Sequence, residues 1–156
     1  MDNELTQKAK EIIENSLYLT LATTSADGSP WNSPVFAAYD DSYTFYWRSD
    51  KNAIHSQNIR TNRMVFIVIF DSHAPWGKGK GVYIKAQAVE LEDKTELEKA
   101  LALLDKRSQK TVRKTDAFIH DAPRRIYKAI PEKVWINDDI EINGQFVDKR
   151  AEIQLK

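Results

Sequence analysis

The feature that most constrains the fold is a series of short β-forming segments separated by tight turns. Aromatic and β-branched residues dominate these segments, which is typical of strands. Asp27-Gly28 and Asp40-Asp41-Ser42 are turn signals between the first three segments, so these strands are expected to pair antiparallel. Six such strands with few helices between them predict a mainly β protein built as an antiparallel barrel. The predicted strands cover residues 17–24, 31–39, 43–47, 64–70, 81–91 and 122–138.

Three other segments have apolar residues at helical spacing. One lies near the N-terminus, one lies within residues 48–62 with Asn62 as its stop, and one covers residues 93–108. A further hairpin is expected over residues 139–155, turned at Asn143-Gly144. The predicted apolar faces are Leu5, Ala9, Ile12 and Ile13 in the first helix, and Leu97, Ala100, Leu101 and Leu104 in the third.

The segment 64–70, MVFIVIF, is apolar at every position. Strands buried on both faces have this composition, so we expect a strand that is covered on both sides. The run is far shorter than the ~20 residues that a membrane-spanning helix needs. The N-terminal segment is charged and lacks the apolar stretch of a signal peptide. We therefore expect a cytoplasmic protein that does not bind a membrane.

Composition excludes several classes of protein. The chain has 156 residues and no visible linker, which predicts a single domain over residues 1–156. Its 23 basic and 23 acidic residues balance, and no long basic run is present, so nucleic-acid binding is not expected. The absence of cysteine excludes disulfides, thiolate metal sites and cysteine nucleophiles. The histidines are His55, His73 and His120, which are too dispersed to predict a metal site.

The turn from the third strand into the next helix carries the strongest signal for a site. A helix N-terminus offers free N–H groups and a partial positive charge. If the helix begins near Ser49, the Ser49 hydroxyl and the Lys51 ammonium complete a cradle for a phosphate group. The alternative is a structural role, with Ser49 or Asp50 as an N-cap and Lys51 as a solvated charge.

The order of these segments resembles the pyridoxamine 5'-phosphate oxidase superfamily, the FMN-binding split β-barrels. The resemblance rests on LYLTLATTSADGSPWNSPVFAAY, then YTFYWRSDKNAIHSQNIRTNRMVFIVIF, then GVYIKAQAVEL. Its most recognisable stretch is Ser-x-Lys at Ser49 to Lys51, a short helix ending at Asn62, and the apolar strand Val65 to Phe70. The resemblance covers about residues 10–140 and implies a six-stranded split β-barrel that holds FMN between the two subunits of a homodimer.

The resemblance also implies a set of cofactor-binding residues. Ser49 and Lys51 are expected at the phosphate, and Arg48 belongs to the same stretch. The remaining expected contacts are Tyr46 and Trp47 along the ribityl chain and ring, and Ser33, Pro34 and Val35 along the isoalloxazine.

The chain departs from the true oxidases in two places. Ser33 and Ala38 stand where those enzymes have Arg and Lys, and the tail lacks their Arg-x-His-Asp-Arg stretch. Oxidation of pyridoxamine 5'-phosphate is therefore not expected.

Three functional hypotheses remain open at this point. The first is an FMN-dependent oxidoreductase or reductase that acts on a small-molecule substrate, with no catalytic residue identified. The second is a module that binds or senses flavin without turnover. The third is a relative of the same fold that binds a deazaflavin or haem. A homodimer is also expected because a flat split barrel leaves apolar faces that one chain does not cover.

Overall fold

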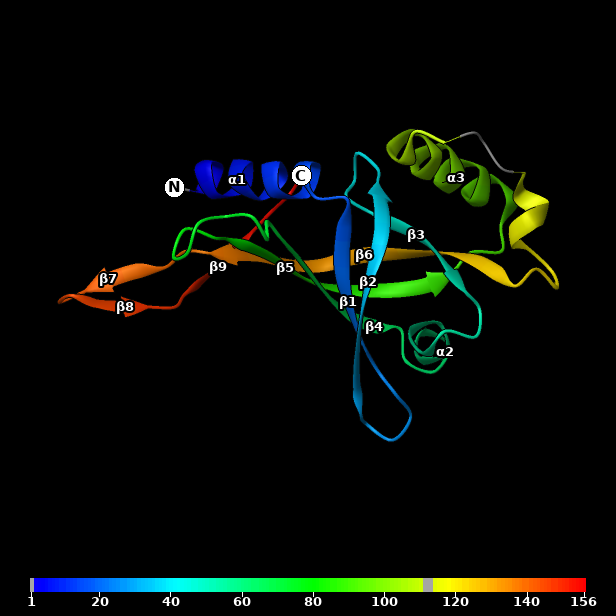
Figure 1. Ribbon diagram of the computed structural model, residues 1–156, viewed down its shortest axis with the longest axis horizontal. Helices are drawn as coiled ribbons and strands as arrows, with labels where there is room; N and C mark the ends of the chain where they lie inside the picture. The colour runs from blue at the N-terminus through cyan, green and yellow to red at the C-terminus, as the bar shows by residue number, and fades with distance from the viewer. Residues whose placement is uncertain (1, 111–113) are drawn as a thin grey trace.

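The computed structural model describes residues 2–110 and 114–156, except the side chains of residues 2 and 3. Its helices are α1 (Asp2–Asn15), α2 (Ile54–Thr61) and α3 (Lys94–Ser108), with a 3-10 turn η1 (Thr115–Phe118). Its strands are β1 (Tyr18–Thr24), β2 (Pro30–Tyr39), β3 (Phe45–Asp50), β4 (Met64–Phe70), β5 (Gly81–Glu90), β6 (Arg124–Asn137), β7 (Ile140–Ile142), β8 (Gln145–Val147) and β9 (Arg150–Ile153). Figure 1 shows their arrangement.

Six strands close into an antiparallel barrel. The hydrogen-bonded order is β3-β2-β1-β4-β5-β6, and β3 pairs again with β6 to complete the circle. β6 is 14 residues long, so it can pair with β5, β3 and β9 along its length. A bulge in the β5–β6 ladder at Lys85/Ala86 helps the sheet to curve. The predicted six-stranded antiparallel barrel is therefore confirmed, and β9 extends the sheet beyond β6.

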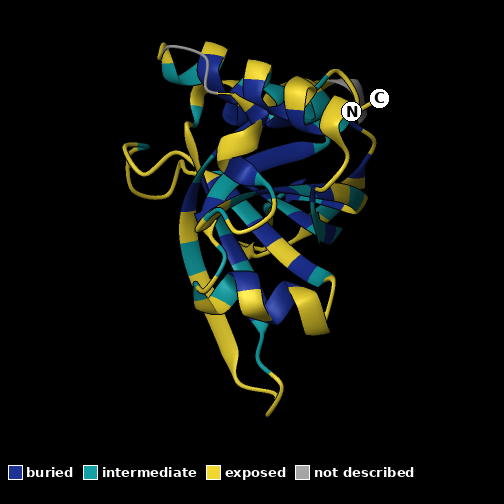
Figure 2. Ribbon diagram, turned by 90° about the vertical axis from the view of Figure 1, so that its right-hand side faces the viewer, coloured by how far each residue is buried: buried dark blue, intermediate teal, exposed yellow. Residues whose placement is uncertain are grey.

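The main core fills the barrel, and helices pack on both sides of it. α1 packs against β4, β5 and β9, whereas α2 packs against β1, β2 and β5 on the other side (Figure 1). Figure 2 shows that the buried residues concentrate where the strands and the inner helix faces meet. Trp47 and Tyr127 stack in the interior with their ring centroids 5.7 Å apart, and both side chains are fully buried. Burial of each large apolar side chain contributes about 1.5–3 kcal/mol to stability.

A second, smaller core lies between α3 and the outer faces of β2 and β3. Asp93 caps α3 because its carboxylate accepts a hydrogen bond from the Glu96 N–H at 2.9 Å. The predicted apolar face is confirmed, since all four of its residues are buried. This cluster includes Ala38, Tyr46, Leu97, Leu101, Leu104 and Ile126.

Two predictions about individual elements are wrong. β4 is covered on one face only, because Phe66 and Phe70 project from the other face and are 39% and 51% exposed. The helix expected to begin near Ser49 begins at Ile54 instead. β3 continues to Asp50 because pairing with β6 extends to Arg124, and this pairing holds Ser49 in the sheet.

Both predicted hairpin turns are confirmed, but the second hairpin ends at Val147 and does not extend over residues 139–155, because β9 pairs with β6. Gly28 lies at the β1–β2 turn with a φ of 85°, which a side chain would disfavour. Asn143 and Gly144 both have positive φ between β7 and β8, as a type I′ turn requires. No helix in the described part of the chain is long and apolar enough to cross a membrane.

Candidate functional site

The expected site residues lie on both faces of β2 and β3. Side chains alternate between the faces of a strand, so residues adjacent in sequence point in opposite directions. Val35 and Trp47 belong to the core inside the barrel, whereas Tyr46 packs beneath α3 on the outside. The structure therefore does not bring the whole predicted set to one place.

On the inner face, one histidine joins two of the predicted residues. His55 lies on α2, with Nε2 2.8 Å from the Ser49 hydroxyl and Nδ1 3.2 Å from the Ser33 hydroxyl. Trp31 donates a hydrogen bond from Nε1 to the Ser33 hydroxyl at 3.0 Å. Burial lowers the pKa of His55 from its ordinary value of 6.5. The sequence analysis treated His55 as an isolated histidine. The signal for its role was its position six residues after Ser49, on the following helix.

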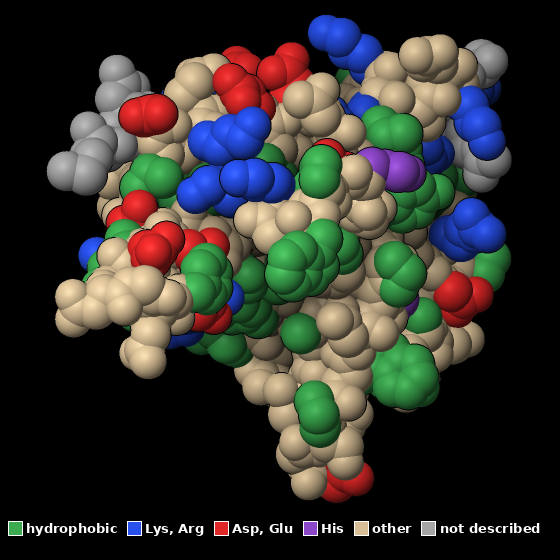
Figure 3. All heavy atoms as spheres, turned by 60° about the vertical axis from the view of Figure 1, so that its left-hand side comes forward, with side chains coloured by type: hydrophobic (Ala, Val, Ile, Leu, Met, Phe, Trp, Pro, Cys, Tyr) green, Lys and Arg blue, Asp and Glu red, His purple; other side chains and the backbone are tan. Residues whose placement is uncertain are grey.

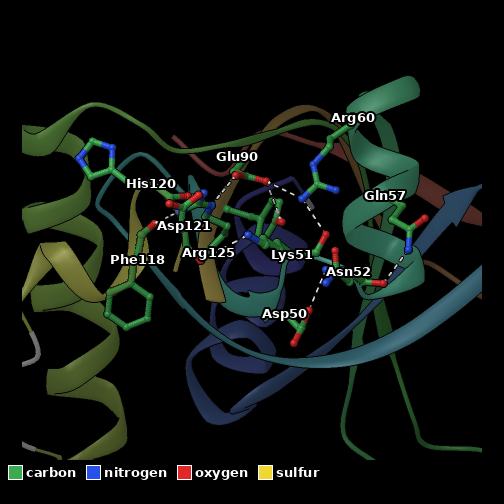
Figure 4. Close-up of polar contacts among 11 residues, drawn as sticks. Asp50, Lys51, Asn52, Gln57, Arg60, Glu90, Phe118, His120, Asp121 and Arg125 are labelled. Atoms are coloured by element: carbon green, nitrogen blue, oxygen red, sulfur yellow. Dashed lines mark hydrogen bonds and ion pairs between the residues drawn. The ribbon is translucent and has the colours of Figure 1, made fainter. Parts of the chain in front are cut away.

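Lys51 lies in the turn between β3 and α2. Its backbone N–H donates to the Pro123 carbonyl at 2.9 Å, and its ammonium donates to the Asp121 carbonyl at 3.4 Å. Its own carbonyl accepts a hydrogen bond from Arg60 at 2.6 Å. Figure 4 shows this turn between α2 and the segment that precedes β6. Lys51 is thus held near that segment and not at the N-terminus of α2, where Ala53 makes no side-chain cap.

A network centred on Glu90 supports this turn. The Glu90 carboxylate lies 3.1 Å from the Arg60 guanidinium and 2.9 Å from the Arg125 guanidinium, and it accepts the Tyr127 hydroxyl at 2.9 Å (Figure 4). Burial, with a smaller contribution from Glu90, raises the pKa of Tyr127 to about 12. Arg125 also donates to the carbonyls of Phe118 and His120. The network therefore ties α2, β5 and β6 together around Lys51.

A groove of about 1060 Å³ lies outside the barrel. It is enclosed by the start of β1, the faces of β2 and β3, and the C-terminal end of α3. Tyr18 and Phe36 form an aromatic floor, with an edge-to-face contact at 5.7 Å between ring centroids. Four basic residues and one acidic residue line its walls. The complete lining comprises Leu17, Tyr18, Phe36, Arg48, Asp105, Arg107, Ser108, Gln109, Lys110 and Arg124.

The cations of this groove are held in different ways. Arg48, the predicted residue that lines the groove, forms an ion pair of 3.3 Å with the buried Asp105 carboxylate. Arg107 donates hydrogen bonds to the carbonyls of Ile13, Glu14 and Ser16. It therefore provides hydrogen-bond donors for carbonyl groups at the C-terminal end of α1. Arg124 pairs with Asp50 across the β3–β6 ladder and thus lies beside the Lys51 turn. A groove with an aromatic floor and cationic walls suits a planar ring that carries an anionic group.

The remaining predicted residues differ in their access to solvent. Trp47 is fully buried in the barrel, and Tyr46 is 4% exposed and donates its hydroxyl to Asp40 at 3.1 Å. Pro34 is exposed on β2, whereas Val35 is buried. Within the described residues, no group of three or more His, Asp or Glu side chains is arranged to hold a metal ion.

An exposed apolar face lies on the barrel near this groove. Phe66 on β4 and Trp135 on β6 stack with their ring centroids 6.3 Å apart. Phe66 is 39% exposed, and Phe70 and Tyr18 are more than half exposed, at 51% and 61%. Figure 3 shows one side of the molecule on which hydrophobic side chains gather across the middle. Exposed apolar patches of this kind are typical of interaction surfaces.

A comparison with protein-family models gives a match that spans most of the chain. The model described as Pyridoxamine 5'-phosphate oxidase matches residues 5–138. A comparison with curated protein sequences gives no significant match.

Several solved structures share the fold. A haem-binding protein from Mycobacterium smegmatis superposes with a TM-score of 0.70 at 18% identity, covering 93% of this chain and 57% of the other. A FAD-binding protein from Mesorhizobium loti gives a TM-score of 0.61 at 20% identity, covering 83% of this chain and 90% of the other. A structure described as an F420 reductase gives a TM-score of 0.58 at 20% identity, covering 80% of this chain and 94% of the other. At these identities, the likeness establishes the shared barrel fold.

Proposed function

The chain belongs to the pyridoxamine 5'-phosphate oxidase family, and from this we propose that it is an FMN-binding oxidoreductase that acts on a small molecule as a homodimer. The single observation that carries the proposal is the groove beside the Lys51 turn. It combines a floor of Tyr18 and Phe36 with the cationic side chains of Arg48 and Arg124.

The residues of the groove fit the two chemical parts of FMN. Arg48 and Arg124 line the groove and supply positive charge for the phosphate group, and Lys51 in the adjoining turn adds a third positive charge near the end of β3. A charge-assisted hydrogen bond to a phosphate contributes about 1.5–3 kcal/mol. The aromatic floor supplies a surface on which a planar ring packs. The volume is also of the order that cofactor pockets have, about 300–1,000 Å³.

The apolar face around Phe66 and Trp135 supports the proposal of a homodimer. Water contacts these rings in a single copy, and a second copy related by a two-fold axis would cover them on both chains at once. The groove is open, so a neighbouring subunit also provides the missing wall that would exclude water from the ring.

FMN supplies the redox chemistry when it is bound, while the protein binds and orients it. Asp105 holds the Arg48 guanidinium against β3, and the Glu90 network fixes the Lys51 turn. Hydride transfer to a flavin needs no general base, and none is assigned. Ser33 and Ala38 have uncharged side chains where the true oxidases have cationic ones, so we exclude pyridoxamine 5'-phosphate from the proposed substrates.

We propose one alternative cofactor and one alternative activity. The solved structures that share the fold include an F420 reductase and a haem-binding protein, so a deazaflavin or haem is the alternative cofactor. A flavin-binding module without turnover is the alternative activity, because no catalytic group is assigned.

Anaerobic reduction of the FMN-loaded protein separates these cases. We expect NADH or NADPH to bleach the flavin absorbance at a rate well above that of free FMN. Retention of oxidised flavin under both reductants would contradict nicotinamide-dependent reductase activity and favour the binding module.

A further inference from the structure

The β7–β8 hairpin forms an arm, defined as residues 139–148, that projects from one end of the barrel (Figure 1). Within the described chain, β7 and β8 pair with each other and with no further strand. An isolated two-stranded hairpin is marginally stable in water, so this arm needs a surface to pack on. Its exposed apolar side chains are Ile140, Ile142, Phe146 and Val147, and Phe146 is 72% exposed.

The arm is held in an outward direction. The type I′ turn at Asn143-Gly144 fixes its tip, and the Asp138 N–H donates to the Lys149 carbonyl at 3.0 Å at its base. The Arg150 guanidinium lies over the Tyr83 ring, 4.4 Å from its centroid, and so anchors the base to β5. These contacts present the apolar residues away from the body of their own chain.

The charge of the arm is opposite to that of the groove. The arm has three acidic residues, Asp139, Glu141 and Asp148, and no basic residue. The groove has four basic residues and one acidic residue. Arg124 lies at the end near Lys51, Arg48 pairs with Asp105 of α3, and Arg107 and Lys110 lie at the C-terminal end of α3. The α3 end is therefore available to an acidic partner while the other end receives a phosphate.

Two-fold symmetry brings these two features together. Figure 1 shows the arm at one end of the long axis and α3 toward the other end. A two-fold axis through the apolar face around Phe66 and Trp135, perpendicular to the long axis, would exchange the two ends and turn each arm toward the α3 end of the other copy. Trp135 lies on β6, the strand that leads into the arm, so the apolar face and the arm are continuous.

We infer that the arm of one copy seats on the groove of a second copy and closes its open side. Phe146 lies on the open side of the groove, opposite the floor of Tyr18 and Phe36 on which the flavin ring packs, and Glu141 lies toward the rim at Lys110. The inference rests on the homodimer of the proposed function and names the segment that each subunit contributes to the cofactor site of the other.

The natural absence of cysteine allows a clean cross-linking test. The full chain carrying both Glu141→Cys and Lys110→Cys is treated with a short bis-maleimide. A matched control carries Glu141→Cys with Lys94→Cys, which places the second thiol at the opposite end of α3, and each single variant is treated in parallel. We expect at least about tenfold more covalent dimer from the first pair, because proximity holds its thiols at a high effective concentration.

Sedimentation of the untreated wild type makes the outcomes distinguishable. If the wild type is a dimer but the Lys110→Cys double variant cross-links no more than the Lys94→Cys control, the placement of the arm is overturned and the homodimer stands. A wild-type monomer would remove the homodimer and this inference with it.

Phe146→Ala should also weaken FMN binding by about two- to tenfold, because an aromatic contact is lost. Unchanged affinity would contradict the role of the arm in the site.

Discussion

Arg48 on β3 and Asp105 on α3 form an ion pair of 3.3 Å that joins the barrel to the helix beside the groove. The Asp105 side chain is 2% exposed, so its charge depends on partners within the protein. Arg48 therefore has two roles in the account, as a structural partner of Asp105 and as a cation facing the groove.

Replacing Arg48 tests both roles. Arg48→Met should lower the free energy of unfolding by about 1–3 kcal/mol, because the buried carboxylate loses a charged partner. It should also weaken FMN binding by roughly tenfold or more. Urea unfolding and flavin fluorescence titration measure the two effects. Lys133→Met is the control, since Lys133 pairs with Glu152 on the exposed surface and its loss should cost at most about 1 kcal/mol.

Lys51 is expected to contribute to affinity for the phosphate rather than to folding. Lys51→Ala should weaken FMN binding by about ten- to a hundredfold, the value of one charge-assisted contact. The melting temperature of the apo-protein should change little, because the Lys51 ammonium makes one long exposed contact, to the Asp121 carbonyl. Riboflavin lacks the phosphate and should bind both proteins alike, and Lys94→Ala should alter neither measurement. Equal FMN affinity in Lys51→Ala and wild type would assign Lys51 a solvated, structural role.

His55 predicts a pH dependence of stability. Burial lowers its pKa in the folded state, so the unfolded state takes up a proton more readily below the ordinary pKa of 6.5. The contribution of neutral His55 to stability is present above pH 6.5 and is lost as the pH falls through the folded pKa. Urea unfolding across this range should show a decrease that is smaller in His55→Gln. His73→Gln should retain the wild-type profile, because His73 is 95% exposed.

The apolar face should control assembly. Phe66→Asp places a charge on the stacked Phe66–Trp135 pair and should shift sedimentation from dimer toward monomer. Trp76→Ser serves as the control, because Trp76 is fully exposed in the loop between β4 and β5 and is not part of the Phe66–Trp135 stack. A Phe66→Asp protein that remains a dimer at low concentration would place the interface elsewhere.

The sequence was sufficient to predict the six barrel strands along the chain and the first and third helices, because these depend on local periodicity and on turn residues such as Gly28 and Asn143. It was insufficient to predict that β4 is covered on one face only. Phe66 is apolar and exposed. The apolar composition of β4 alone does not distinguish a covered face from one that is open in a single copy.

The candidate site was predicted in part. Arg48 lines the groove, and Lys51 lies beside it. The extension of β3 to Asp50 depends on pairing with β6, more than 70 residues away, and this pairing turned Ser49 toward His55. The groove itself could not be predicted, because it requires α3 to pack outside β2 and bring Lys110 near Phe36.

The most direct test of the central claim is a titration of the purified protein with FMN, followed by the visible absorbance of the flavin after removal of free ligand. The proposed function predicts saturable binding of one FMN per chain, with flavin absorbance retained by wild type and reduced in Arg124→Ala. Failure of FMN to saturate, or purification of the protein with the absorbance of a deazaflavin or the Soret band of haem, would contradict it.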